Sequence, residues 1–168
     1  METTSTHDVP TAPPIYRVAK ELSESSGFLL ARLGIGFKAR AVEAAELAGH
    51  ELYDYSVLAL LGEGDRETQA TIAHAMMLDP SRLVALLDSL EERGLVARER
   101  DPRDRRRHVV RITAAGQSEL LRLRDLVHEV EDEFFAPLDP ESRAVFHEQL
   151  LRLAVQNDPG CAGLSSTE

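Results

Sequence analysis

The chain has 168 residues, of which 43% are hydrophobic, 29% charged and 5% aromatic, and it carries a formal net charge of −10. This length suits one domain with a substantial core and is too short for two full domains, and the composition is that of an ordinary globular protein. No apolar run approaches the roughly 20 residues of a membrane span, and the first residues lack the pattern of a secretory signal. We therefore expect a cytoplasmic protein without membrane contact.

The negative charge is unevenly distributed along the chain. Residues 64–111 hold ten Lys or Arg against nine Asp or Glu, whereas the rest of the chain holds nine against twenty. Seven of the basic residues, all of them arginine, lie between Arg98 and Arg111. A polyanion would therefore approach this middle segment and not the acidic flanks.

The first part of the chain is predicted to be a disordered tail followed by helices. Residues 1–14 contain three prolines and several small polar residues, a composition typical of disorder. Apolar residues recur at intervals of three and four residues over about 16–48, which predicts a long helix. Gly34 and Gly36 are expected to interrupt this helix, either by bending it or by allowing another backbone to come close. A second helix is predicted from about residue 52 to 61, because the glycines that follow it are a C-terminal stop signal.

A short third helix, at about 68–76, is followed by a tight connection and a fourth helix. Asp79 is a good N-cap, and Pro80 suits the first helical position because its missing N–H is not needed there. The fourth helix ends at Gly94 and has one apolar stripe, formed by Leu83, Leu86, Leu87 and Leu90.

Two short strands, 95–98 and 108–112, flank a turn at 101–104 that is rich in turn-forming residues. Thr113 can cap a long helix that runs to about residue 135. Asp139 and Pro140 then begin a last helix, and the chain is predicted to fray from Gln156 onwards. A short helix, a tight connection, a capped helix and a small hairpin together predict a winged helix-turn-helix, so the fold class is mainly α with a small β-hairpin wing (α+β).

The second helix of a helix-turn-helix enters the major groove of DNA and contacts base edges with residues near its N-terminus. The candidates on the face opposite the leucine stripe are Ser81, Arg82, Ala85 and Ser89. Arg82 can contact guanine in a bidentate manner, Ser81 can donate to a base or a phosphate, and Ala85 can touch a thymine methyl group. The alternative is that these residues form an ordinary solvated helix face.

The tip of the predicted hairpin carries an unusual density of arginine, at Arg103, Arg105, Arg106 and Arg107. So many like charges repel one another unless they are solvated or matched to a polyanion, and a narrow minor groove favours an inserted guanidinium. Asp104, two residues before Arg106, can pair with a guanidinium and fix its direction. The alternative is a solvated turn in which Asp101 and Asp104 serve only as turn formers.

The stretch from Asp54 to Gly116 resembles the MarR family of bacterial winged-helix regulators. The resemblance rests on YSVLALL, on the helix-turn-helix segment and on the pattern LEERGLV…R…DPRDRR…V.IT..G. It implies a homodimer with interlocking terminal helices that binds a pseudo-palindromic double-stranded operator, usually as a repressor. It also implies release by a small effector, often an anionic aromatic compound.

With this resemblance the chain divides into five parts. They are a disordered tail at 1–14, an N-terminal dimerisation helix at 15–50, a DNA-binding domain at 51–113, C-terminal dimerisation helices at 114–155 and a flexible tail at 156–168.

The resemblance also assigns roles by motif position. It makes Arg106 the arginine inserted in the minor groove and Asp104 its anchor, and it places Ser81 and Arg82 among the recognition-helix contacts. On this basis Arg103, Arg105 and Arg107 are expected to contact the surrounding phosphates. The strand residues Arg98 and Arg111 are expected to contribute less.

The sequence departs from the family pattern at three positions. Met77 occupies a turn position where many members carry glycine, so the connection is expected to differ in shape. Ala85 and Ser89 stand where many members carry arginine. We therefore expect this protein to depend more on its wing than on its recognition helix.

Candidate effector-binding residues lie near the start of the second helix. His50, Tyr53 and Tyr55 cluster there, and Arg32 or Lys38 from the first helix can supply a cation for a carboxylate or phenolate. The alternative is that the tyrosines are half-buried packing residues and that Arg32 is a surface charge.

Other function classes find little support. The sequence has no phosphate-binding glycine loop, nucleophile elbow or plausible metal triad, so we expect no enzyme, no cofactor and no metal. A metal site at His128 and Glu131–Glu133 is much less favoured than a solvated acidic helix face, and Cys161 is favoured as a bystander over a sensor thiol. The main alternative is a winged-helix module that binds protein, although such a module would not need an arginine-rich wing.

Overall fold

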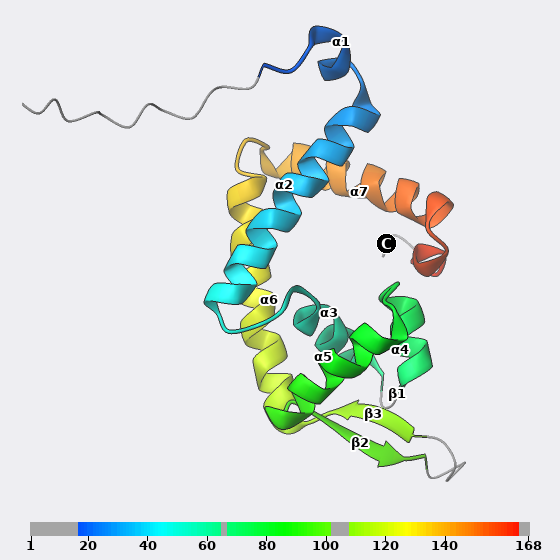
Figure 1. The fold of residues 1–168 in the computed structure, drawn as a ribbon. Coiled ribbons are helices and arrows are strands. Elements are labelled where there is room, and N and C mark those ends of the chain that lie inside the picture. Colours follow the sequence, from blue (N-terminus) through cyan, green and yellow to red (C-terminus); the bar gives the residue numbers. More distant parts are fainter. Residues whose placement is uncertain (1–16, 65–66, 102–107, 165–168) are drawn as a thin grey trace, which may run out of the picture. The chain divides into compact units, whose positions relative to one another are not determined.

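The computed structural model describes residues 17–64, 67–101 and 108–164. It contains two compact units, of which the first ends at Gly36 and the second begins at Phe37. The elements in chain order are α1 (Lys20–Ser23), α2 (Ser26–Leu47), α3 (Leu52–Glu63), β1 (Glu67–Thr68), α4 (Gln69–Ala75), α5 (Pro80–Glu92), β2 (Val96–Arg100), β3 (His108–Ile112), α6 (Ala114–Phe134), α7 (Pro140–Asn157) and the 3-10 turn η1 (Pro159–Cys161), labelled in Figure 1.

The N-terminal helical segment differs from its prediction in two respects. It consists of the short α1 and the long α2, which begins anew at Ser26. Gly34 and Gly36 lie inside α2, which is continuous across both positions. The predicted interruption by these glycines is therefore wrong.

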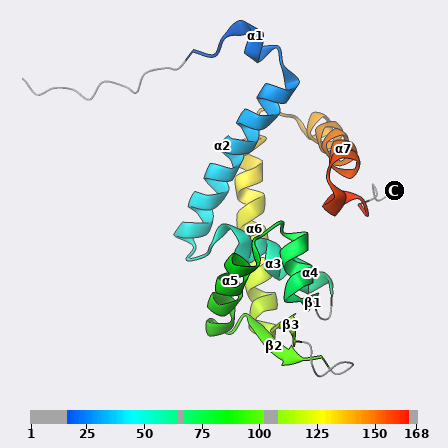
Figure 2. The ribbon, with the colours of Figure 1, turned by 45° about the vertical axis from the view of Figure 1, so that its right-hand side comes forward.

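The second unit is built around a core shared by α3, α4 and α5, which group together in Figures 1 and 2. All four leucines of the predicted stripe on α5 are buried in this core. They meet apolar residues of the neighbouring elements, including Val57, Leu58, Leu61, Ile72, Val96, Val110, Leu120 and Leu123. Since burial of a leucine side chain contributes about 1.5–3 kcal/mol, this stripe fixes which face of α5 turns outwards.

The predicted hairpin is confirmed, and a short third strand joins it. β2 pairs antiparallel with β3 over the register from Val96↔Ile112 to Arg100↔His108. β1 pairs with the other edge of β3, which gives the strand order β1-β3-β2. The sequence did not predict β1, because two residues are too few for an alternating pattern to appear.

The base of the hairpin is fixed to the start of α6. The Thr113 hydroxyl donates to the Gly94 carbonyl at 2.7 Å, and the Gly116 N–H donates to Thr113 Oγ1 at 3.0 Å. This confirms Thr113 as the cap. A Cβ at Gly116 would lie 2.0 Å from the Leu95 carbonyl oxygen, so a residue without a side chain is required at this contact.

The last helix begins as predicted and ends later. Asp139 caps α7 by accepting a hydrogen bond from the Ser142 N–H at 2.8 Å. Instead of fraying from Gln156, the chain continues helically to Asn157 and then forms η1. None of the helices in the described ranges is both long and apolar enough to cross a membrane.

Candidate functional site

The N-terminus of α5 is held by its capping residue. The Ser81 N–H donates to Asp79 Oδ1 at 2.9 Å, and the Ser81 hydroxyl donates to the same oxygen. These two bonds lower the pKa of Asp79 below its ordinary value of 3.8. The cap that the sequence predicts is therefore confirmed, and it already uses the hydroxyl proton of a residue predicted to contact DNA.

The outward face of α5 carries the other predicted contacts. Arg82 and Ala85 are exposed, and Ser89 is partly buried. The guanidinium carbon of Arg82 lies 5.1 Å from the centroid of the Tyr53 ring on α3, a geometry in which the ring attracts the cation. Arg82 thus leaves its helix at an exposed position and folds back onto a neighbouring element.

Two of the three arginines on the wing strands, Arg98 and Arg111, are paired with carboxylates, whereas Arg100 at the end of β2 is exposed. Arg98 Nη1 lies 2.6 Å from Asp88 and 2.8 Å from Glu91 on α5, and Arg111 Nε lies 2.6 Å from Glu99 on β2. These pairs offset most of the positive charge of the strands. They give a physical reason for expecting Arg98 and Arg111 to contribute less to polyanion binding than the tip.

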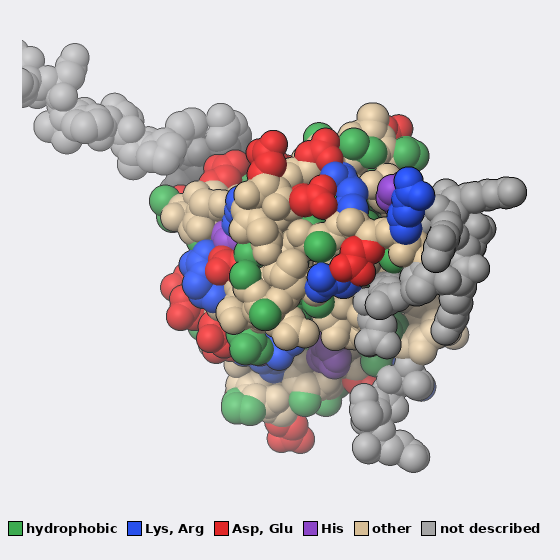
Figure 3. Space-filling model, turned by 90° about the horizontal axis from the view of Figure 1, so that it is seen from below, with side chains coloured by type: hydrophobic (Ala, Val, Ile, Leu, Met, Phe, Trp, Pro, Cys, Tyr) green, Lys and Arg blue, Asp and Glu red, His purple; other side chains and the backbone are tan. Residues whose placement is uncertain are grey.

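The predicted wing-tip residues Arg103, Asp104, Arg105, Arg106 and Arg107 lie outside the described residues, so their assignments stay predictions. The Arg100↔His108 pair closes the described ladder immediately beside this segment. Figure 3 views the end of the second unit that carries the sheet, and its described surface mixes basic and acidic side chains. Since the described residues form no single basic field there, strong polyanion binding would depend on the tip.

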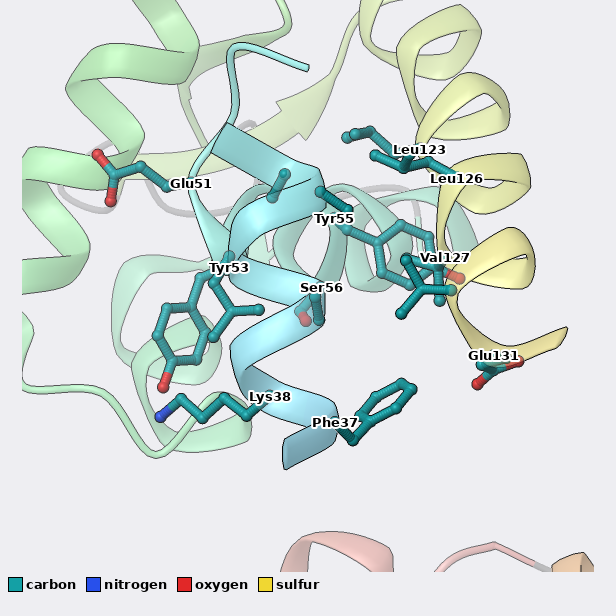
Figure 4. Close-up of a pocket in the computed structure, with 15 residues that line it drawn as sticks. Phe37, Lys38, Glu51, Tyr53, Tyr55, Ser56, Leu123, Leu126, Val127 and Glu131 are labelled. Carbon is teal, nitrogen blue, oxygen red and sulfur yellow. The ribbon is translucent and has the colours of Figure 1, made fainter. Parts of the chain in front are cut away.

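A cavity of about 370 Å³ lies in the second unit between α2, α3 and α6. Its walls are mostly apolar, with a few polar side chains at the margins (Figure 4). The lining residues are Phe37, Lys38, Ala41, Ala44, Ala45, Glu51, Leu52, Tyr53, Tyr55, Ser56, Leu123, Leu126, Val127, Val130 and Glu131. A concave apolar site with few polar groups is typical of small-molecule binding.

The predicted effector residues are distributed over several places. Tyr53 and Tyr55 line the cavity, as does Lys38, the second candidate cation. His50 is buried and does not belong to the described lining. Arg32 is an exposed residue of the first unit.

His50 belongs instead to a charged cluster that sequence reasoning did not find. Its Nδ1 lies 2.8 Å from Asp54 Oδ2 on α3, and its Nε2 lies 2.5 Å from Glu119 Oε1 on α6. Arg93, the C-cap residue directly after α5, donates from Nη1 to the same Asp54 oxygen at 2.8 Å. The cluster therefore joins α3, α5 and α6.

The pKa of one member of this cluster is shifted. The hydrogen bond from Arg122 is the main reason why the pKa of Glu119 is lowered, and His50 adds to the effect. The four-residue spacing of His50 and Asp54 could have indicated from the sequence that these two side chains interact. The other partners lie 43 and 69 residues away from His50, and no local pattern links them.

The described residues offer no group of three or more His, Cys, Asp or Glu side chains that could hold a metal ion. Glu131, which the sequence suggested as part of a metal site or of a solvated acidic helix face, lines the cavity. Cys161 lies in η1 and is partly buried, and burial is the main reason why its pKa is raised. A raised pKa makes a thiol less reactive.

Comparisons with known proteins agree with this geometry. The model of the MarR family matches residues 52–108. A transcriptional regulatory protein for the hcr operon of Thauera aromatica is 32% identical over 103 residues, which span 61% of this chain and 62% of that protein. The transcriptional regulator HosA of Escherichia coli O111:H- is 33% identical over 108 residues, which span 61% of this chain and 79% of that protein.

Solved structures of the regulator CouR are similar over more of the chain. The structure of CouR from Rhodococcus jostii RHA1 with p-coumaroyl-CoA is 31% identical, has a TM-score of 0.71, and covers 89% of this chain and 100% of that one. The structure of the repressor CouR bound to a 23-mer DNA duplex is 30% identical and has a TM-score of 0.72. The match covers 83% of this chain and 99% of that one. The chain therefore belongs to the MarR family of winged-helix, DNA-binding transcriptional regulators, which are not enzymes.

Proposed function

We propose that this protein is a cytoplasmic transcriptional repressor that binds a pseudo-palindromic DNA operator as a homodimer and is released by a small aromatic anion. The observation that carries the proposal is the exposed face of α5, where Arg82 and Ala85 stand opposite four buried leucines. The cap at Asp79 fixes the start of this helix. The wing lies beside it, with the β2–α5 ion pairs of Arg98 holding the two together.

The wing tip supplies the second part of the proposed DNA interface. From the sequence, we assign Arg106 to the minor groove with Asp104 as its anchor, and we assign Arg103, Arg105 and Arg107 to phosphates. DNA-bound CouR is a relative that binds a duplex, which supports DNA as the partner. The interaction-module alternative has no such support.

The proposed dimer rests on apolar side chains that the described structure leaves exposed. On α7, Val145 and Leu153 are each about half exposed, as is Leu30 on α2, and Ile35 on α2 is more exposed still. Exposed apolar residues at this density are typical of association surfaces. A second copy of the chain is the partner that the family relationship favours.

The proposed effector is deduced from the cavity. The apolar walls of the cavity suit an aromatic ring, and Lys38 in its lining can pair with one carboxylate or phenolate. Glu51 and Glu131 also line the cavity, so a ligand with several negative charges there would be repelled. CouR, a relative solved with p-coumaroyl-CoA, supports an aromatic acyl compound as the ligand class.

The test is to incubate the purified protein with fragmented DNA of its source genome, recover the bound fragments and sequence them. We expect a few pseudo-palindromic sites that the protein retains in a gel shift. Arg82→Ala should relax the preference at particular base pairs, by about 1–3 kcal/mol if the contact is bidentate. Arg106→Ala should weaken binding strongly while the protein stays dimeric. If no specific fragments are recovered, the interaction-module alternative replaces the proposal.

A further inference from the structure

Tyr53 belongs to two features at once. It lines the cavity between α2, α3 and α6, and its ring lies under the Arg82 guanidinium at 5.1 Å. Arg82 does not belong to the described lining of the cavity. The ring of Tyr53 is therefore a direct physical link between the cavity and the outward face of α5.

A neighbouring contact holds the other end of α5. Asp54, next to Tyr53 on α3, accepts a hydrogen bond from Arg93 Nη1 at 2.8 Å, and only 1% of the Asp54 side chain is exposed. The first turn of α3 thus contacts both ends of α5 through consecutive residues. The Asp54 contact is an ion pair whose carboxylate is buried, whereas Tyr53 is only partly buried and borders open space.

This difference separates a fixed contact from an adjustable one. A ring that borders a cavity of 370 Å³ can change its orientation when a ligand fills that space, whereas the buried Asp54 carboxylate is held by His50, the Glu51 N–H and Arg93. If the Tyr53 ring moves, the guanidinium of Arg82 loses the aromatic face that orients it. The C-terminal attachment of α5 would stay in place.

We propose that Tyr53 is a positioning residue for Arg82 and that it transmits occupancy of the cavity to the DNA interface. The proposal rests on the proposed function, because it takes the cavity as the ligand site and Arg82 as a DNA contact. A ligand that displaces the Tyr53 ring removes the orientation of Arg82. By linkage, the Arg82–Tyr53 contact opposes ligand binding to the same extent.

The linkage can be measured without DNA. The probe is 1-anilinonaphthalene-8-sulfonate, a fluorescent aromatic anion, titrated into the wild type, Arg82→Ala, Tyr53→Leu and the double variant. We expect Arg82→Ala to tighten probe binding about two- to fivefold, the worth of an exposed cation–π contact, because the ring is then free to move. In the Tyr53→Leu background the same substitution should have no effect.

Three controls keep the result specific. Tyr55→Leu changes another lining residue, and Arg82→Ala should still tighten probe binding in that background. Tyr53→Phe keeps the ring, so Arg82→Ala should still tighten probe binding in that background, and circular dichroism establishes that each variant is folded. Ala44→Trp fills the cavity and should abolish the titrated signal, which establishes where the probe binds.

The results separate this proposal from the proposed function. The linkage is overturned if Arg82→Ala leaves the probe affinity unchanged. It is also overturned if Arg82→Ala changes the probe affinity by the same factor in the wild type and in Tyr53→Leu. Failure of the wild type to bind any specific DNA overturns the proposed function, although the probe cycle would still hold. If the wild type binds DNA, the probe should release it, and Tyr53→Leu should reduce that release.

Discussion

At the scale of single residues, the turn of the helix-turn-helix contains one strained position. Met77 has φ = 49°, which lies in the left-handed region, and its side chain is 79% exposed. An L-residue other than glycine is disfavoured there by about 1–2 kcal/mol. The sequence predicted a differently shaped connection because glycine is absent, yet the backbone adopts a conformation that favours glycine.

We therefore expect Met77→Gly to be more stable than Met77→Ala by about 1 kcal/mol. Both variants remove the exposed side chain, so their difference isolates the backbone conformation from the loss of the Met77 contacts. Urea denaturation followed by circular dichroism measures it. Equal stability of the two variants would mean that the turn is not strained at this position.

The sequence was most informative where a residue acts on its near neighbours. Asp79, Thr113 and Asp139 were predicted as caps or helix starts, and each accepts a hydrogen bond from a backbone N–H two or three residues ahead. His50 was grouped with Tyr53 and Tyr55, but it does not belong to the described lining of the cavity that they share, and its partners include Glu119, which is 69 residues away. Propensities and spacing contain no information about such contacts.

At the scale of elements, the charged cluster decides how α3, α5 and α6 are held together. Asp54 is almost fully buried and accepts from Arg93 at 2.8 Å. A hydrogen bond to a charged group contributes about 1.5–3 kcal/mol, and the Arg93 guanidinium, whose side chain is 33% exposed, can still reach water if the Asp54 charge is removed. The exposed pair of Arg111 and Glu99 has similar geometry, but exposed pairs contribute about 0–1 kcal/mol.

We expect Asp54→Asn to lower the free energy of unfolding by about 2 kcal/mol and Glu99→Gln to lower it by less than about 1 kcal/mol. Both substitutions remove one negative charge and keep the shape of the side chain. Thermal and urea denaturation compare them. A loss of equal size in both variants would show that burial of Asp54 is not what matters.

The same cluster predicts a pH dependence. Because Arg122 and His50 lower the pKa of Glu119 below its ordinary value of 4.5, the folded state favours the ionised carboxylate. Its stabilising contribution is therefore fully present above pH 4.5 and is lost as the pH falls through the lower pKa of the folded state. Around this carboxylate lie Arg122 on α6, His50 before α3, and Arg93 and Asp54 in contact with that imidazole.

We expect Glu119→Gln to be less stable than the wild type by about 1 kcal/mol at neutral pH. The difference should stay constant down to about pH 5.5 and shrink below pH 4.5, since the wild-type carboxylate then becomes protonated. Urea titrations at several pH values measure it. A difference that grows on acidification would contradict the assigned direction of the pKa shift.

Elements with strong periodicity were predicted well, and marginal ones were not. The stripe of α5 has four matching leucines, and the hairpin has two short strands around a turn rich in turn-forming residues, so both elements were found. The predicted helix at 16–48 proved to be α1 and α2, separated near Ser25, because helical composition alone does not reveal a single break. The strand β1 was missed because its two residues are too few to form a recognisable sequence pattern.

At the scale of the whole molecule, the charge distribution and the proposed function explain each other. The chain has a net charge of −10, but residues 64–111 are close to neutral. Of the three arginines on the wing strands, Arg98 and Arg111 are paired with carboxylates, so the exposed Arg100 and the tip arginines would supply the unpaired positive charge that a duplex meets. The acidic flanks would then orient the protein in the field of the DNA.

The difference between paired and unpaired arginines predicts which wing arginines determine the salt dependence of DNA binding. Each phosphate contact adds about 0.9 to the slope of log affinity against log salt. Arg105→Ala should therefore reduce the magnitude of that slope by roughly 2 for a homodimer, one contact on each protomer. Arg98→Ala removes the same charge from the same hairpin, but its guanidinium is held by Asp88 and Glu91, so the slope should stay close to the wild type. Fluorescence anisotropy with one operator at several salt concentrations measures both, and equal slopes in the two variants would refute the assignment of the tip to phosphates.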